Sequence, residues 1–137
     1  MKRAVLLVSF FWTLPWVGTA DPALECGVGL QSQVMIEKCV DETTFSVDQT
    51  IDIALGLAFD AAKELDSETG RDIAVPSLMA GQAAWNAYRE AHCDYVGSFR
   101  GGVTDTKITL GACRIELGRE RVAELMKSLD VYRFRWE

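Results

Sequence analysis

The 137-residue sequence has little of what most catalytic sites need. It contains a single histidine, His92, and no Cys-x-x-C pair. A nucleophilic serine or cysteine needs a base beside it, and His92 is the one imidazole that could serve. The segment GSFRG at 97–101 is not the G-x-S-x-G of a nucleophile elbow, because its serine comes one position early. We therefore expect the chain not to be an enzyme.

The same scarcity argues against a metal site. His92 directly precedes Cys93, and neighbouring residues on a helix point about 100° apart, so the two cannot easily share one ion. Acidic pairs such as Asp48 and Asp52 are one helical turn apart, which is typical of a solvated helix face. Glycoside hydrolysis needs two carboxyl groups across a cleft instead. We expect no metal and no cofactor.

Long hydrophobic stretches are absent beyond the start of the chain. Lys2 and Arg3 precede an apolar stretch over residues 4–17, and Gly18-Thr19-Ala20 follows. This order is typical of a signal peptide over residues 1–20, cleaved after Ala20. The stretch is shorter than the roughly 20 residues of a membrane span. We expect no membrane span and a soluble periplasmic or secreted domain over residues 21–137.

Basic residues are fewer than acidic ones. Residues 21–137 hold 12 Lys and Arg against 20 Asp and Glu, a net charge of −8. Such a surface repels nucleic acid and anionic membranes and attracts a cationic partner. Solubility alone explains the charge equally well, so acidity does not identify a partner.

Four cysteines follow the leader, and an even number in an exported domain predicts disulfides. They are Cys26, Cys39, Cys93 and Cys113. The Gly101-Gly102 turn lies midway between the last two, each ten residues from position 103, so antiparallel helices would bring them level. Gly27 and Gly29 let the chain fold back between the first two. We predict Cys26–Cys39 and Cys93–Cys113.

Helical periodicity covers most of the chain, and strand-like alternation is missing before the C-terminus. Residues 23–29 are expected to be a flexible link. Residues 30–41 are helix-prone, and a capping box at Ser46–Gln49 either starts a second helix or lies inside a continuous one. Two further apolar stripes at helical spacing cover residues 78–96 and 108–129. The fold class is all-α, a small disulfide-stapled bundle of three to four helices.

Aromatic residues are concentrated in one helix and in the tail. Trp85 lies on the apolar stripe and is expected to anchor the core, while Arg89 is expected to pair with Asp48 or Asp52; a ligand pocket is the alternative. In the tail, Tyr132, Phe134 and Trp136 alternate with Arg133 and Arg135. This tail either docks on the bundle or binds a partner or a glycan.

The helix signals combine into a recognisable pattern. It reads Gln82-x-x-Trp85-x-x-Tyr88-Arg89-x-x-x-Cys93, then Gly101-Gly102, then Cys113-x-x-x-Leu117-x-x-x-Arg121, with Asp48 nine residues after Cys39. The set resembles the LprI-type lysozyme-inhibitor family of secreted or lipid-anchored bacterial helical domains. The resemblance implies that a structural motif is formed by Asp48, Gln82, Trp85, Tyr88, Arg89, Leu117 and Arg121.

The resemblance also implies a protein partner, namely a basic lysozyme or another wall hydrolase. Residues 97–106 form the candidate binding loop, pinned at its base by the predicted Cys93–Cys113 disulfide. Its partner-binding residues would be Ser98, Arg100, Gly101, Gly102 and Asp105. A structural or envelope-maintenance protein without inhibitory activity remains the alternative.

Overall fold

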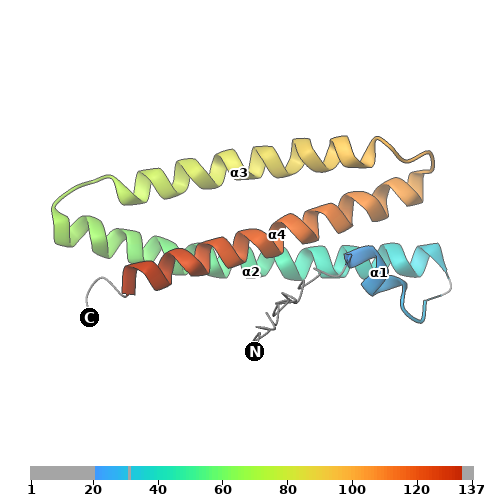
Figure 1. The fold of residues 1–137 in the computed structure, drawn as a ribbon, viewed down its shortest axis with the longest axis horizontal. Coiled ribbons are helices and arrows are strands. Elements are labelled where there is room, and N and C mark those ends of the chain that lie inside the picture. Colours follow the sequence, from blue (N-terminus) through green and yellow to red (C-terminus); the bar gives the residue numbers. More distant parts are fainter. Residues whose placement is uncertain (1–20, 31, 134–137) are drawn as a thin grey trace, which may run out of the picture.

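Three long helices lie side by side, and a short fourth helix packs at one end of the bundle. The computed structural model describes residues 21–30 and 32–133, with side chains through residue 130. The helices are α1 (Pro22–Gly27), α2 (Gln33–Thr69), α3 (Ala74–Gly97) and α4 (Val103–Arg133). Helices α2 and α4 run parallel, and α3 runs antiparallel to both (Figure 1). The described residues contain no strand, which confirms the all-α, disulfide-stapled bundle.

Helix α2 is continuous over 37 residues, so the capping box at Ser46–Gln49 lies inside it. The threonines that could have interrupted this helix donate their hydroxyl groups to carbonyls one turn earlier. Thr43 bonds Cys39 O, Thr44 bonds Val40 O and Thr50 bonds Ser46 O, each at 2.8 Å. Because these polar groups are satisfied within the helix, they do not compete with its backbone ladder.

The expectation of a flexible link over residues 23–29 is wrong, because Pro22–Gly27 forms α1. Asp21 caps this helix by accepting the Ala23 N–H at 2.9 Å, and Pro22 occupies its first turn. Arg119 of α4 donates two hydrogen bonds to the Glu25 carboxylate, at 2.8 and 3.0 Å. This interaction lowers the pKa of Glu25. Local capping and a tertiary ion pair therefore order a short segment whose two glycines suggested flexibility.

The turn between α2 and α3 is built around one carboxylate. Gly70 ends α2 in the left-handed region with φ 62°. Asp66 then accepts the backbone N–H groups of three consecutive residues at the start of α3, at 3.1, 2.9 and 3.0 Å: Ile73, Ala74 and Val75. These bonds, the one from Val75 first, lower the pKa of Asp66. Asp66 thus caps the N-terminus of the neighbouring helix.

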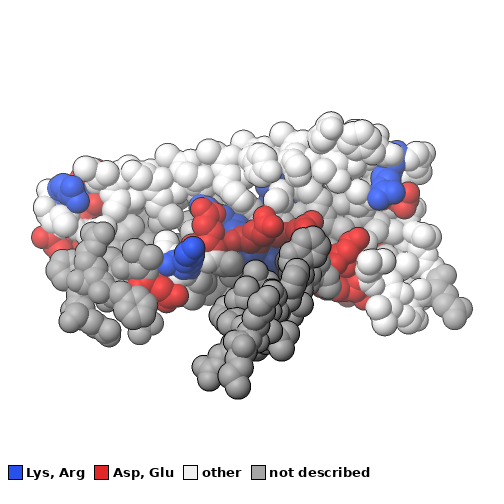
Figure 2. All heavy atoms as spheres, in the orientation of Figure 1, with Lys and Arg blue, Asp and Glu red and all other residues white. Residues whose placement is uncertain are grey.

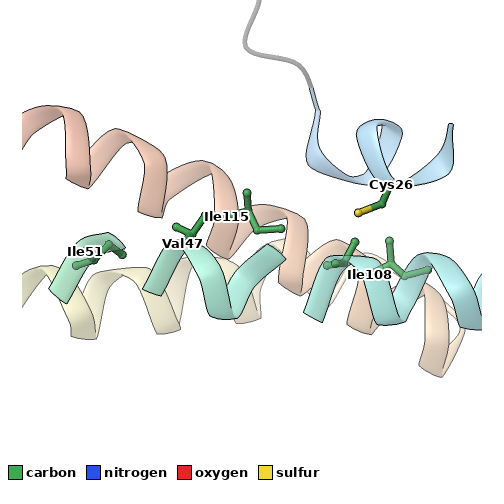
Figure 3. Packing of buried hydrophobic residues seen from close by; sticks show 6 residues of the cluster. Cys26, Val47, Ile51, Ile108 and Ile115 are labelled. Atoms are coloured by element: carbon green, nitrogen blue, oxygen red, sulfur yellow. The ribbon is translucent and has the colours of Figure 1, made fainter. Parts of the chain in front are cut away.

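The aliphatic core lies mainly along the contact of α2 with α4. Buried side chains from both helices meet there, and Cys26 of α1 reaches the same cluster (Figure 3). The cluster consists of Cys26, Val40, Val47, Ile51, Ile108 and Ile115. A smaller cluster of Ala54, Ala58 and Leu125 continues the core toward the far end. Helix α2 therefore supplies most of the buried aliphatic side chains of the core.

Two glycines of α4 let it approach α2 closely. A Cβ built at Gly111 would overlap the side chain of Val40, and one at Gly118 would overlap Val47. Both valines are buried in the core. The seven-residue spacing places both glycines on the face of α4 that contacts α2. The side-chain space that they give up is filled by valines of the partner helix.

Both predicted disulfides are confirmed, with Cα–Cα distances of 5.8 Å for Cys26–Cys39 and 5.6 Å for Cys93–Cys113. The first joins α1 to α2, and the second joins α3 to α4. Both lie in the half of the bundle that contains α1 and the α3–α4 turn (Figure 1). None of the helices described combines the length and the apolar character that crossing a membrane requires. The predicted signal peptide, residues 1–20, lies outside the described residues.

Candidate functional site

At the α3–α4 contact, two arginines lie close to one tryptophan ring. The guanidinium carbon of Arg89 lies 5.3 Å from the Trp85 ring centroid, and that of Arg121 lies 5.7 Å from it. Each distance is within the range of a cation–π interaction. Both arginines are buried, each with about 9% of its surface exposed. Burial of two like charges requires compensating partners, and the structure supplies them.

Arg89 connects all three long helices. Its Nε and Nη2 donate to the backbone carbonyl of Arg114 in α4, at 3.1 and 2.8 Å. Its Nη2 also lies 2.7 Å from Oδ1 of Asp48 in α2. That oxygen accepts no well-aligned hydrogen bond, so the contact with Asp48 is an ion pair without hydrogen-bond geometry. Of the two carboxylates considered from the sequence, Asp48 is the partner that the structure selects.

Arg121 of α4 is held beside the same ring by side-chain partners. Its Nε donates to Oε1 of Gln82 at 2.9 Å, and its Nη1 donates to Oε2 of Glu124 at 2.7 Å. Gln82 in turn donates to Oδ1 of Asn86 at 3.0 Å. Leu117 is half-buried one turn before Arg121, on the stripe that also carries Cys113. We call Asp48, Gln82, Trp85, Arg89 and Arg121 the arginine–tryptophan cluster.

The space beside this cluster is small. A cavity of about 150 Å³ adjoins it, and Asp52 and Asn86 are among its lining residues. Pockets that bind small molecules usually measure roughly 300–1,000 Å³. The Nε groups of both arginines donate to acceptors on the facing helix, the Arg114 carbonyl and Gln82 Oε1. The geometry therefore favours the structural interpretation of Trp85 and Arg89 over a ligand pocket.

Tyr88 belongs to the same sequence pattern but lies outside the cluster. Its side chain is 52% exposed, and its ring stacks on that of His92 with the centroids 5.3 Å apart. The structure thus separates one member of the expected motif from the rest. His92 is half-buried and contacts an aromatic ring, with no second imidazole in the sequence to complete a metal site.

The candidate binding loop is shorter than the predicted residues 97–106. Helix α3 continues through Gly97 and α4 begins at Val103, so the loop spans 98–102. Asp105 lies in the first turn of α4. The expected ten-residue loop is wrong because helical hydrogen bonds extend into it from both sides. Thr106 N–H bonds Gly102 O at 2.9 Å, which starts α4 earlier than its polar residues suggested.

The residues of this loop are exposed but held by local hydrogen bonds. Ser98 Oγ donates to Tyr95 O at 2.6 Å, and the Arg100 N–H donates to Gly97 O at 3.0 Å. Ser98, Arg100, Gly101, Gly102 and Asp105 are all exposed. At the end of α3, a Cβ on Gly97 would lie 2.8 Å from Cγ of Leu110, so the two helices approach closely there. The loop at 98–102 is therefore short and restricted by hydrogen bonds to the end of α3; we call it the loop tip.

Apart from Tyr88, the motif and loop residues predicted from the sequence fall in two places. The arginine–tryptophan cluster lies along the α3–α4 contact, and the loop tip lies at one end, connected to it through Cys93–Cys113. Sequence reasoning missed the Arg114 carbonyl and the ion pair of Arg114 with Glu90 at 2.7 Å. A backbone acceptor has no side-chain signature, so no sequence signal could have identified it. Of the aromatic–basic tail, α4 includes residues through Arg133 in helical backbone, and 134–137 lie outside the described residues.

Comparison of the sequence with known proteins identifies the family. A family model described as "Lysozyme inhibitor LprI" matches residues 26–125. The chain is also 31% identical over 106 residues to "Uncharacterized protein R02472" of Rhizobium meliloti (strain 1021), which covers 72% of this chain and 75% of the relative. No solved structure matches. The family match spans both disulfides and the whole arginine–tryptophan cluster, and the chain belongs to the LprI lysozyme inhibitor family.

Proposed function

We propose that this protein acts in the periplasm or outside the cell by binding a basic lysozyme or a related wall hydrolase, rather than by catalysis. Membership of the LprI family is the observation that carries the proposal. The two disulfides support it, since such bonds persist in oxidising compartments. The net charge of −8 over residues 21–137 also supports it, because it speeds encounter with a cationic protein.

The loop tip at 98–102, together with the first turn of α4, is the proposed contact with the rim of the enzyme's cleft. The Cys93–Cys113 bridge and the local hydrogen bonds restrict this tip before binding, which lowers the entropy lost on association. Asp105 offers a carboxylate to the cationic rim, and Ser98 and Arg100 offer hydrogen bonds. All three side chains are exposed and lie at the same end of the bundle.

The test is a cell-wall lysis assay with the non-reduced protein and a basic lysozyme, run at low and at physiological salt. Inhibition that weakens as salt rises is the expected result. Asp105→Asn is expected to weaken inhibition several-fold. Its matched control is Asp60→Asn, which removes the same charge from an exposed position toward the C-terminal end of α2. Unchanged lysis at tens of micromolar protein and low salt would favour the structural, envelope-maintenance alternative.

A further inference from the structure

One side of α3 presents aromatic rings to solvent. Tyr88, His92 and Tyr95 follow the spacing i, i+4, i+7 on one stripe of α3, and Phe99, just beyond the helix, packs against Tyr95. Tyr88, Tyr95 and Phe99 are 52%, 62% and 70% exposed. We call these four residues the aromatic flank. Its last member lies within the loop tip at 98–102, so the flank and the tip form one continuous surface.

The rings of the aromatic flank are organised among themselves. Tyr88 stacks on His92 at 5.3 Å, and Tyr95 meets Phe99 edge to face at 5.0 Å. Exposed alanines at positions 84, 87 and 91 lie beside them and leave the rings protruding. Side chains already restricted by neighbours lose less conformational entropy when a partner covers them. Contiguous exposed apolar surface with a polar border is typical of interaction sites.

The charge next to the flank specifies the chemistry of the partner. Helix α3 carries no charged residue from Ala74 to Tyr88. Helix α4 contacts α3 through Cys113 and Arg121, and the exposed Glu116 and Glu120 lie one turn apart beside that contact stripe on α4. Neither glutamate forms an ion pair with another described residue. Figure 2 shows acidic side chains gathered along the middle of this face, over α4, below the largely uncharged surface of α3.

Two other occupants fit this surface poorly. Helix α4 rises about 45 Å from residue 103 to residue 133, whereas four residues beyond it span about 14 Å at most. Residues 134–137 therefore cannot cover Tyr95 and Phe99. A second copy of the chain would bring two acidic α4 surfaces together, and like charges in contact oppose association. A cationic protein has neither problem, and its Arg and Lys side chains can also lie over exposed aromatic rings.

We propose that the aromatic flank is the main contact surface for the basic lysozyme or wall hydrolase, with Glu116 and Glu120 as its acidic border and the loop tip as its end. This inference rests on the proposed function and deepens it. It assigns most of the binding free energy to three exposed rings instead of the polar loop residues. Aromatic anchors carry most of the binding energy in many protein interfaces.

The experiment compares two double variants by direct binding of the non-reduced protein to a basic lysozyme. Tyr95→Ser with Phe99→Ser removes two rings of the flank. The matched control, Phe45→Ser with Ile53→Ser, removes two similarly exposed apolar side chains from α2, at 65% and 66% exposure. We expect the flank variant to raise Kd at least tenfold and the control to change it less than twofold. Equal thermal unfolding of both variants shows that the fold is retained.

The outcomes distinguish a wrong contact surface from a wrong proposed function. If the wild type binds and the flank variant binds equally well, the flank is not the contact surface, while the proposed function stands. Equal losses in the flank variant and the control would also overturn the assignment. If the wild type does not bind lysozyme at low salt, both proposals fail. Protection of the Tyr88 and Tyr95 amides from hydrogen exchange in the complex, without protection around Phe45, is the expected independent support.

Discussion

Helices α2 and α3 flank the same α4, yet they are held to it in different ways. The buried residues of α2 are aliphatic: Val40, Val47, Ile51, Ala54 and Ala58. Those of α3 within the described part of the chain are Gln82, Arg89, Cys93 and Gly97. Helix α2 thus packs by hydrophobic burial, and α3 is attached by a disulfide and buried hydrogen bonds. Outside this narrow contact, Tyr88 and Tyr95 of α3 remain exposed.

Removing the Cys93–Cys113 bond should have the largest effect on this contrast. We expect the Cys93→Ala, Cys113→Ala double variant to lower the free energy of unfolding by about 3 kcal/mol, because a 20-residue loop is no longer closed in the unfolded chain. Urea unfolding gives the total, and hydrogen exchange shows where protection is lost. In the variant, the exchange rates of the α3 amides should increase much more than those of the α2 amides. Equal loss along both helices would contradict the contrast.

Filling the α2–α4 contact should come next. Gly111→Ala adds a methyl group where Val40 already lies, so we expect a loss of about 2 kcal/mol from overpacking. Gly56→Ala is the matched control, because a Cβ at Gly56 meets nothing within 4 Å. That substitution should leave stability unchanged or raise it slightly, since alanine is the better helix former. Thermal unfolding of the two variants side by side measures the difference; similar melting temperatures would show that the contact is loosely packed.

A milder change tests how α3 is attached. Arg89→Lys keeps the charge near Asp48 but cannot place two N–H donors on the Arg114 carbonyl. We expect a loss of about 1.5 kcal/mol, the lower end of the range for one hydrogen bond to a charged group. Arg71→Lys, at an exposed position in the α2–α3 turn, serves as the control. If denaturant midpoints of the two variants coincide, the arginine–tryptophan cluster does not hold α3.

The smallest effect concerns the cap that Asp66 provides to α3. Its pKa is lowered in the folded protein by the N–H groups of Val75, Ala74 and Ile73, so its contribution is complete above its ordinary pKa. The stability that it adds is lost as the pH falls below about 4. Asp66→Asn should therefore reduce stability at neutral pH and flatten its decline in acid. Melting curves between pH 2 and pH 7 measure this slope, and an unchanged slope would exclude the carboxylate as its source.

Much of the fold follows from the sequence because its determinants are local or regularly spaced. The apolar stripes predicted the long helices, and the position of Gly101-Gly102 between Cys93 and Cys113 predicted a disulfide that the structure confirms. Helix α1 was missed although Asp21 and Pro22 are local signals of a helix start, because the contact that fixes it to α4 comes from Arg119, 94 positions after Glu25. Tyr88 belongs to the predicted structural motif, but it lies off the apolar stripe of its helix, and the structure leaves its side chain exposed.

The placement of both disulfides in one half of the bundle has a mechanical consequence. Heat or a protease should open this rod from its uncrosslinked end, where the α2–α3 turn lies and α4 terminates. The crosslinked end would then stay assembled longest. The bundle can therefore lose the order of one end to damage while the disulfide-linked end keeps its surface intact.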